Sequence, residues 1–65
     1  MENMLERVTV RQASEELNID VETVRYMMQK ERLPIGYAIK RDGKERYNYV
    51  IYRGMLDKYK ESVAG

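Results

Sequence analysis

The 65-residue sequence contains no cysteine and no histidine. The lack of cysteine excludes disulfide bonds and thiolate metal sites, and the lack of histidine removes the commonest metal ligand and the usual acid–base catalyst. We therefore expect no cofactor and no metal site. No apolar run approaches the roughly 18 residues of a transmembrane helix, so we also expect a soluble, cytoplasmic protein with no membrane partner.

Room for a catalytic site is also scarce. A chain of this length buries only about 60% of its unfolded surface, which leaves a small core and little space for an enclosed cleft. No paired-carboxylate, nucleophile–base or phosphate-loop pattern is present. We expect a single domain, residues 1–65, that is not an enzyme. Residues 1–7 have no clear period and are interpreted as a flexible lead-in, although Met4, Leu5 and Val8 could contribute an apolar edge or a short strand.

Net charge is small, at +1, but the charges are unevenly placed. Residues 1–22 carry two basic and six acidic groups, a balance of −4. Residues 23–53 carry eight basic and three acidic groups, a balance of +5, and residues 54–65 have a net charge of zero. Two interpretations stay open: an uneven solvated surface, or a dipolar domain whose positive side faces a polyanion.

A first helix is predicted over residues 10–17. Thr9 followed three residues later by Gln12 resembles a capping box, which satisfies the free amide groups at a helix start. Small and apolar residues then share one face: Val10, Ala13, Ser14 and Leu17. Asn18 tolerates the left-handed conformation that a sharp helix exit needs. These signals predict a short helix that ends in a tight turn.

A second helix is predicted from Val21 to Lys30 or Arg32. The Asp20 carboxylate can accept the first amide protons of this helix, and Pro34 disfavours helical backbone at the residue before it. The predicted core face is formed by Val24, Met27 and Met28. The two helices and their turn make a helix-turn-helix with a polar, cation-bearing outer face. DNA binding is the leading hypothesis.

Next, the spacing of apolar residues changes from that of a helix to the every-second-residue alternation of a β-strand. This change predicts a β-hairpin over residues 35–51. A two-residue Asp42-Gly43 loop would set the apolar residues of one strand opposite the polar residues of the other. We therefore predict a three-residue loop, Arg41 to Gly43, with Gly43 left-handed. That register puts six apolar residues on one face: Ile35, Tyr37, Ile39, Tyr47, Tyr49 and Ile51. Tyrosines on this face favour core packing over stacking on single-stranded nucleic acid.

A final amphipathic helix is predicted from Tyr52 to about Ser62, closing over the sheet. Gly54, which is unfavourable in a helix interior, could mark its start.

The stretch Ala13 to Tyr26, ASEELNIDVETVRY, resembles the helix-turn-helix of the excisionase and MerR-like winged-helix group. Residues 33–40 and 47–51 look like the wing of small proteins encoded by phages and integrative elements. The sequence departs from the group's pattern at Asn18, where glycine is usual, and at Val21, where proline is common. The resemblance implies an α+β winged helix-turn-helix with two helices, a two-stranded hairpin wing and a C-terminal helix.

This resemblance implies a sequence-specific DNA-binding protein of a mobile element, such as an excisionase or recombination directionality factor. Such proteins bind beside attachment sites, often as cooperative arrays, and direct the integrase toward excision. Expected partners are thus double-stranded DNA, an integrase or recombinase, and further copies of the chain. A small transcriptional repressor of a phage or integrative element is an alternative. An alternative of another class is a protein-interaction module that docks an integrase or polymerase subunit.

The candidate DNA contacts lie on two segments, a recognition helix at about residues 21–31 and a basic wing at residues 40–46. On the helix they are Glu22, Thr23, Arg25, Tyr26, Gln29 and Lys30. On the wing they are Lys40, Arg41, Lys44 and Arg46. A carboxylate can accept from cytosine, a threonine can contact thymine or phosphate, and arginine can bind guanine or phosphate. The resemblance favours phosphate for the Arg25–Tyr26 pair. Wing cations could neutralise phosphates or enter a minor groove, or could serve solubility alone.

Overall fold

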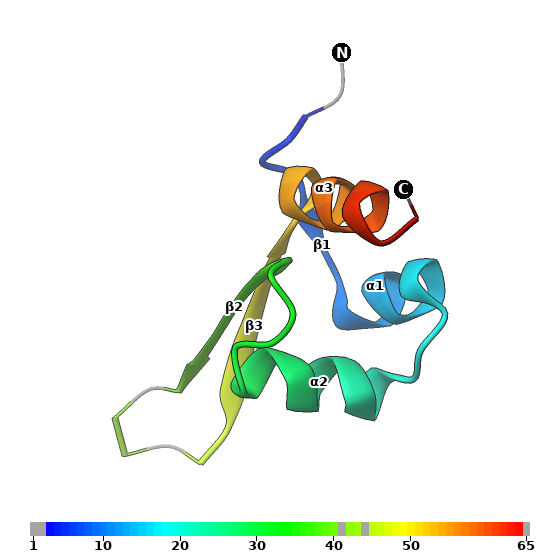
Figure 1. The fold of residues 1–65 in the computed structure, drawn as a ribbon. Coiled ribbons are helices and arrows are strands. Elements are labelled where there is room, and N and C mark those ends of the chain that lie inside the picture. Colours follow the sequence, from blue (N-terminus) through cyan, green and yellow to red (C-terminus); the bar gives the residue numbers. More distant parts are fainter. Residues whose placement is uncertain (1–2, 41, 44, 65) are drawn as a thin grey trace.

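The computed structural model describes residues 3–40, 42–43 and 45–64. Its elements follow in the order β1 (Arg7–Val8), α1 (Val10–Leu17), α2 (Val21–Gln29), β2 (Gly36–Lys40), β3 (Tyr47–Tyr52) and α3 (Arg53–Ala64) (Figure 1). The α+β class predicted from the sequence is confirmed. Within the described ranges, no helix has the length and apolar character needed to cross a membrane.

Local capping groups set the bounds of α1 and the start of α2. The Thr9 side chain accepts a hydrogen bond from the Gln12 amide, and both halves of the predicted capping box are present. Asn18 has φ 59° and ends α1 in the left-handed region. Asp20 caps α2 by accepting from the Thr23 amide. These predictions are confirmed because each depends on residues within one turn of the helix end.

The end of α2 is also a local feature of the backbone. Glu31 follows the helix with φ 56°, a left-handed conformation that is unusual for a non-glycine residue. The Arg32 amide donates to the Met27 carbonyl at 2.8 Å, and the Glu31 amide donates to the Met28 carbonyl at 3.1 Å. This paired arrangement satisfies carbonyls that the helix leaves free. The chain therefore reverses toward β2 before Pro34 is reached.

The sheet has three antiparallel strands in the order β1-β3-β2, so the predicted two-stranded hairpin is incomplete. Arg7 pairs with Tyr52 and Val8 pairs with Ile51, which places Arg7 in a strand and not in a lead-in. Upstream of β1, the Met4 carbonyl accepts from the Gly54 amide at 3.0 Å. A short strand involving Val8 was one of the possibilities, but a strand of two residues is too short to show a period, so neither its bounds nor its partner could be predicted.

The hairpin register also differs from the prediction. Lys40 pairs with Tyr47 and Ala38 pairs with Tyr49, so odd positions of β2 lie opposite even positions of β3. Six residues, 41–46, separate the paired ends, and the predicted three-residue loop is wrong. Gly43 is left-handed as predicted, with φ 76°, whereas Arg41 lies outside the described residues.

As a result, the six apolar residues do not share one face. Tyr37 and Ile39 lie on the outer face of the sheet and are 57% and 48% exposed. Gly36 and Ala38 occupy the inner face, opposite Ile51 and Tyr49. Because α2 packs against β2, small side chains are needed on that face, and the packing of the helix outweighs the hydrophobic alternation.

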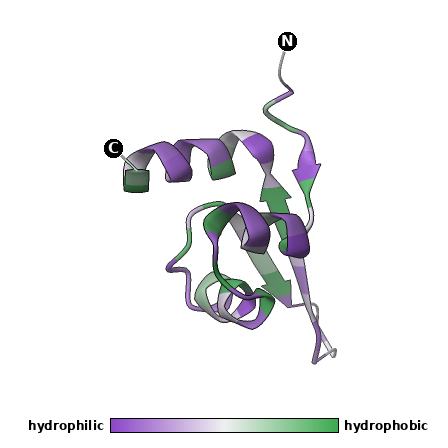
Figure 2. Ribbon diagram, turned by 90° about the vertical axis from the view of Figure 1, so that its right-hand side faces the viewer, coloured by the Kyte–Doolittle hydropathy of each residue, from purple (hydrophilic) through white to green (hydrophobic). Residues whose placement is uncertain are grey.

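The core lies between the inner face of the sheet and the three helices. Its buried members are Val8, Ala13, Val24, Met28, Leu33, Ile35, Ile51 and Leu56. In Figure 2 the two longer strands carry hydrophobic segments, and the helices alternate hydrophilic and hydrophobic segments along their length. Ala13 and Ser14 are buried in α1, so small residues face the core there as predicted. The core holds α2 with one apolar stripe inward and leaves its polar stripe in solvent.

Candidate nucleic-acid interface

Helix α2 is amphipathic, and its polar face lies in solvent. Val24 and Met28 are buried on one side. The exposed residues of the other side are Glu22, Arg25, Tyr26, Gln29 and Lys30. Five of the six predicted helix contacts are therefore accessible on one surface. The orientation of the helix follows from the apolar stripe, which was visible in the sequence.

Thr23 is the exception among the predicted helix contacts. It is half-buried, its amide donates to the Asp20 carboxylate at 3.2 Å, and its hydroxyl donates to the same carboxylate. These hydrogen bonds lower the pKa of Asp20 from its usual value. Thr23 therefore acts first as the partner of the helix cap, and its methyl group is the part left for a ligand.

Arg25 and Glu22 form an ion pair along the first turns of α2. An Arg25 Nη1 atom lies 3.3 Å from a Glu22 carboxylate oxygen, and the two side chains are 46% and 84% exposed. An ion pair this exposed contributes at most about 1 kcal/mol, so a phosphate or a base can displace it at little cost. The pair presents a forked donor and an acceptor next to each other.

Further along the helix, Lys30 and Tyr26 lie side by side. The Lys30 Nζ atom is 5.8 Å from the centre of the Tyr26 ring, within the range of a weak cation–π contact. Tyr26 is 60% exposed, so its hydroxyl is free to reach an anionic partner. The second half of α2 thus adds a hydroxyl and an ammonium group to the exposed face.

A hydrogen bond joins α2 directly to the hairpin. Gln29 Nε2 donates to the Tyr49 hydroxyl at 2.6 Å, across 20 residues of sequence. Gln29 was predicted to contact DNA, and Tyr49 was assigned to the core. Their contact depends on the register of β3, which the sequence did not provide. It ties the end of α2 to the strand that leads out of the hairpin tip.

The hairpin extends beyond α2 at the lower left of Figure 1. Lys40, the last residue of β2, and Arg46, which directly precedes β3, are exposed, whereas Arg41 and Lys44, the other predicted wing contacts, lie outside the described residues. The Lys40 Nζ atom is 5.9 Å from the centre of the Tyr47 ring. The described cations of the hairpin thus lie on the element that the Gln29–Tyr49 hydrogen bond joins to α2.

Not every cation of residues 23–53, the range with the positive charge balance, lies on α2 or the hairpin. An Arg53 Nη1 atom lies 2.7 Å from Glu16, and the Lys60 ammonium lies 2.7 Å from the same carboxylate. Hydrogen bonds from Arg53 and then from Lys60 lower the pKa of Glu16 to about 2. This network joins α1 to α3, away from the hairpin tip. Because its members are distant in sequence, counting charges along the chain could not separate it from the cations of α2 and the hairpin.

Arg7 is a cation that sequence reasoning passed over. Its guanidinium donates to the Tyr49 carbonyl at 3.4 Å, so it lies beside the hairpin strand that contacts α2. The pairing of β1 with β3 was the signal needed to place it, and that pairing was not predicted.

No family model, curated protein or solved structure matches the chain.

Proposed function

We propose that the protein is a winged helix-turn-helix that binds double-stranded DNA, with α2 in the major groove and the hairpin on a neighbouring part of the backbone. The Gln29–Tyr49 hydrogen bond is the observation that supports this most, because it holds helix and hairpin as one surface. A major groove is wide enough to admit an α-helix. Fixing the hairpin relative to the helix sets the spacing between base contacts and phosphate contacts.

In this proposal the first turns of α2 read the bases. Arg25 leaves its weak ion pair to bind guanine or a phosphate, and Glu22 is then free to accept from a cytosine amino group. The Thr23 methyl group can contact a thymine methyl, since its hydroxyl is bonded to Asp20. Tyr26 and Lys30 lie further along the helix and donate to phosphates.

The hairpin supplies the electrostatic part of the affinity. Lys40 and Arg46, together with Arg41 and Lys44 from the sequence, can each neutralise a phosphate. Nearby acidic residues, Asp42 and Glu45 among them, weaken the local potential. A single copy should therefore bind with modest affinity and strong salt dependence, which makes cooperative or paired binding useful.

The biological role that we propose is control of excision, as an excisionase or recombination directionality factor acting with an integrase in the cytoplasm. The resemblance of the helix-turn-helix and hairpin sequences supports this role. A repressor would share the same DNA chemistry at a different site. Sequencing the DNA that the purified protein retains from sheared DNA of its source separates the two: sites beside an integrase gene support excision control, and promoters support repression.

We expect removal of a hairpin or helix cation to reduce both affinity and its salt dependence. Arg46→Ala and Arg25→Ala should each weaken DNA binding and lower the slope of log affinity against log salt by about 1, because one phosphate contact is lost. Binding is measured by fluorescence anisotropy of a labelled duplex at several salt concentrations. If Arg25 contacts a base instead, its variant loses sequence discrimination and keeps the slope.

Lys58→Ala is the matched control. Lys58 is equally cationic and exposed but lies on α3, at the opposite end of the molecule from α2 (Figure 1). Its removal should leave the slope unchanged. Equal effects of Arg46→Ala and Lys58→Ala would mean that only net charge matters and would contradict the proposed interface. Absence of any duplex binding at low salt would favour a module that docks a protein partner.

A further inference from the structure

The outer edge of β2 carries backbone groups that the sheet does not use. The Tyr52 amide donates to the Ile35 carbonyl at 3.3 Å, which identifies these two residues as a hydrogen-bonded antiparallel pair. Because such pairs alternate along a ladder, Tyr37 and Ile39 also direct their backbone groups toward β3. The amides and carbonyls of Gly36, Ala38 and Lys40 therefore point away from β3. Since β2 is the last strand in the order β1-β3-β2, no strand of the described chain pairs with them.

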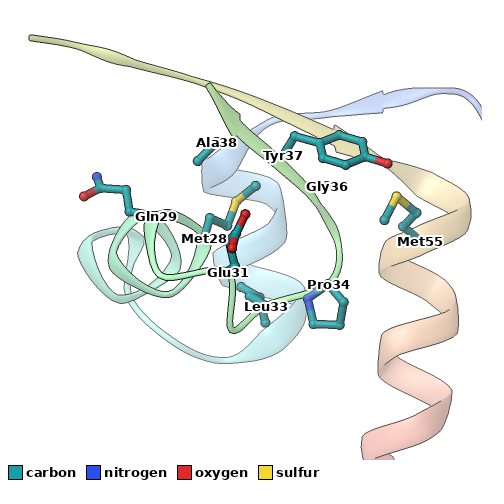
Figure 3. Close-up of a pocket in the computed structure, with 9 residues that line it drawn as sticks. All are labelled: Met28, Gln29, Glu31, Leu33, Pro34, Gly36, Tyr37, Ala38 and Met55. Carbon is teal, nitrogen blue, oxygen red and sulfur yellow. The ribbon is translucent and has the colours of Figure 1, made fainter. Parts of the chain in front are cut away.

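A groove of about 320 Å³ lies against this edge (Figure 3). Its walls come from α2, the segment that follows it, and α3, and include Met28, Leu33, Pro34 and Met55. Gly36 and Ala38 line it from the strand side. The groove therefore combines apolar walls with unpaired backbone donors and acceptors, which is the combination that an added β-strand requires.

Most of the edge also lacks the features that normally prevent strand addition. Natural edge strands are protected by proline, by charged side chains or by a bulge. The one charged residue of β2 is Lys40 at its end. Residues 36–39 contain neither proline nor charge, and Tyr37 and Ile39 stand 57% and 48% exposed on the outer face. Large apolar side chains on an open edge indicate a surface that is covered in the working state.

We propose that the occupant is β2 of a second copy of this chain, paired antiparallel about Ala38. Gly36 of one copy then lies opposite Lys40 of the other, and the two Ala38 residues face each other. At each of these pairs, both partners direct their free amide and carbonyl toward the neighbouring strand and exchange two hydrogen bonds. The two three-stranded sheets become one continuous sheet.

The inner-face side chains fit this pairing. The second copy presents Gly36 and Ala38 to the groove, and both are small enough to lie against its walls. Its one long residue, Lys40, arrives opposite Gly36, beside Glu31. Figure 3 shows the Glu31 carboxylate directed from the loop toward β2. Symmetry repeats this Lys40–Glu31 pair at the other end of the interface, so two opposite charges meet twice.

The outer-face side chains are complementary as well. In this register Tyr37 of one copy faces Ile39 of the other across a non-hydrogen-bonded pair, where side chains approach most closely. Val50 already lies opposite Tyr37 within each copy, so the pairing extends one apolar stripe across both sheets. Tyr37 and Ile39, which the register leaves in solvent in one copy, pack side by side in two and are each partly covered.

The pairing also has a consequence for DNA binding. An axis perpendicular to the joined sheet keeps both helix-bearing faces on one side, so two copies of α2 would be presented together. The dimer itself does not depend on the proposed function, because it is expected without DNA.

The experiment is sedimentation equilibrium of the whole chain over a range of concentrations in the absence of DNA. We expect the average mass to rise from the monomer value of 7.8 kDa toward twice that value. Ala38→Pro should abolish the rise, since it removes an amide donor that the ladder to β3 does not use. Tyr37→Lys, which places a charge on the edge, should weaken association at least about tenfold without changing the β2–β3 ladder.

A charge exchange tests the register. Lys40→Glu and Glu31→Lys should each weaken the dimer, and the double variant should restore it, because the two charges are only reversed. Val63→Lys, an exposed apolar residue on α3, is the control for Tyr37→Lys and should dimerise normally. A chain that stays monomeric at every concentration overturns the proposal and leaves the edge to an extended segment of another protein. A dimer unaffected by Tyr37→Lys and by the charge variants overturns it in favour of another surface.

Discussion

Gly36 is the residue at which the fold leaves no room for a side chain. A Cβ atom built there would lie 1.9 Å from the Val50 carbonyl oxygen and 2.8 Å from the Ile51 Cα atom, and both are backbone atoms of β3. Neither can move without opening the ladder between the strands. In the sequence Gly36 was simply one of the small residues alternating with Ile35 and Tyr37, so its role became visible only with the register of the hairpin.

We therefore expect Gly36→Ala to destabilise the protein by more than about 2 kcal/mol, because β2 must separate from β3 to accept the methyl group. Urea unfolding followed by circular dichroism measures the loss. Gly54→Ala is the comparison, since the nearest atom to its Cβ is the Met4 Cβ at 3.0 Å, and alanine favours the helix. A Gly36→Ala variant as stable as Gly54→Ala would contradict the observed strand pairing.

At the scale of elements, charged side chains hold α1 and α3 together. Glu16 on α1 accepts from Arg53 and Lys60 of α3, and Asp57 lies 3.3 Å from the same arginine. The Glu16 side chain is 27% exposed, so solvent screens these pairs only in part. The network replaces part of the apolar contact that so small a core cannot provide between these helices.

This network should make the stability of the folded protein depend on pH. The pKa of Glu16 is lowered from 4.5 to about 2 in the folded protein, chiefly by hydrogen bonds from Arg53. A lowered folded-state pKa stabilises the protein above pH 4.5 and loses that contribution as the pH falls toward 2. Glu16→Gln should cost on the order of 1 kcal/mol at pH 7, after allowance for solvent screening.

Thermal unfolding from pH 7 down to about pH 2 tests this expectation. The difference between Glu16→Gln and the natural sequence should stay constant down to about pH 4.5, shrink below it, and be mostly lost by about pH 2. Glu15→Gln is the matched control, since Glu15 precedes Glu16 on α1 and forms no salt bridge in the described part of the chain. A difference that stays constant with pH would show that the carboxylate charge does not contribute.

For the molecule as a whole, stability rests on one small core to which every element contributes. Leu56 carries the contribution of α3 and is fully buried, whereas Val63 on the same helix is 68% exposed. Leu56→Ala should cost about 2 to 5 kcal/mol, a large share of the stability that a small domain possesses.

Val63→Ala should change stability by less than about 0.5 kcal/mol, because an exposed side chain loses little on truncation. Guanidinium unfolding of both variants measures the contrast. Equal effects would mean that α3 is not seated on the core through Leu56.

The first two helices and the polar face of α2 could be predicted closely from the sequence. Thr9 and Asp20 cap amides within their own helices, and Asn18 and Gly43 adopt left-handed conformations that their own chemistry tolerates. Each of these interactions spans a few residues, so the pattern of the chain contains all the information that they need. The segregation of α2 into a Val24–Met28 side and an exposed side follows from the helical period in the same way.

Tertiary structure alone decided how those pieces meet. The pairing of β1 with β3 joins segments more than 40 residues apart, and the exposure of Tyr37 and Ile39 depends on a hairpin register that local alternation predicted wrongly. The Gln29–Tyr49 bond likewise joins a helix to a strand 20 residues away. A shift by one residue turns a whole strand over, and the space required by α2 settled that choice. The sequence by itself therefore determined the elements and their polar faces. Packing between residues far apart in the chain determined which faces are buried and which remain for a partner.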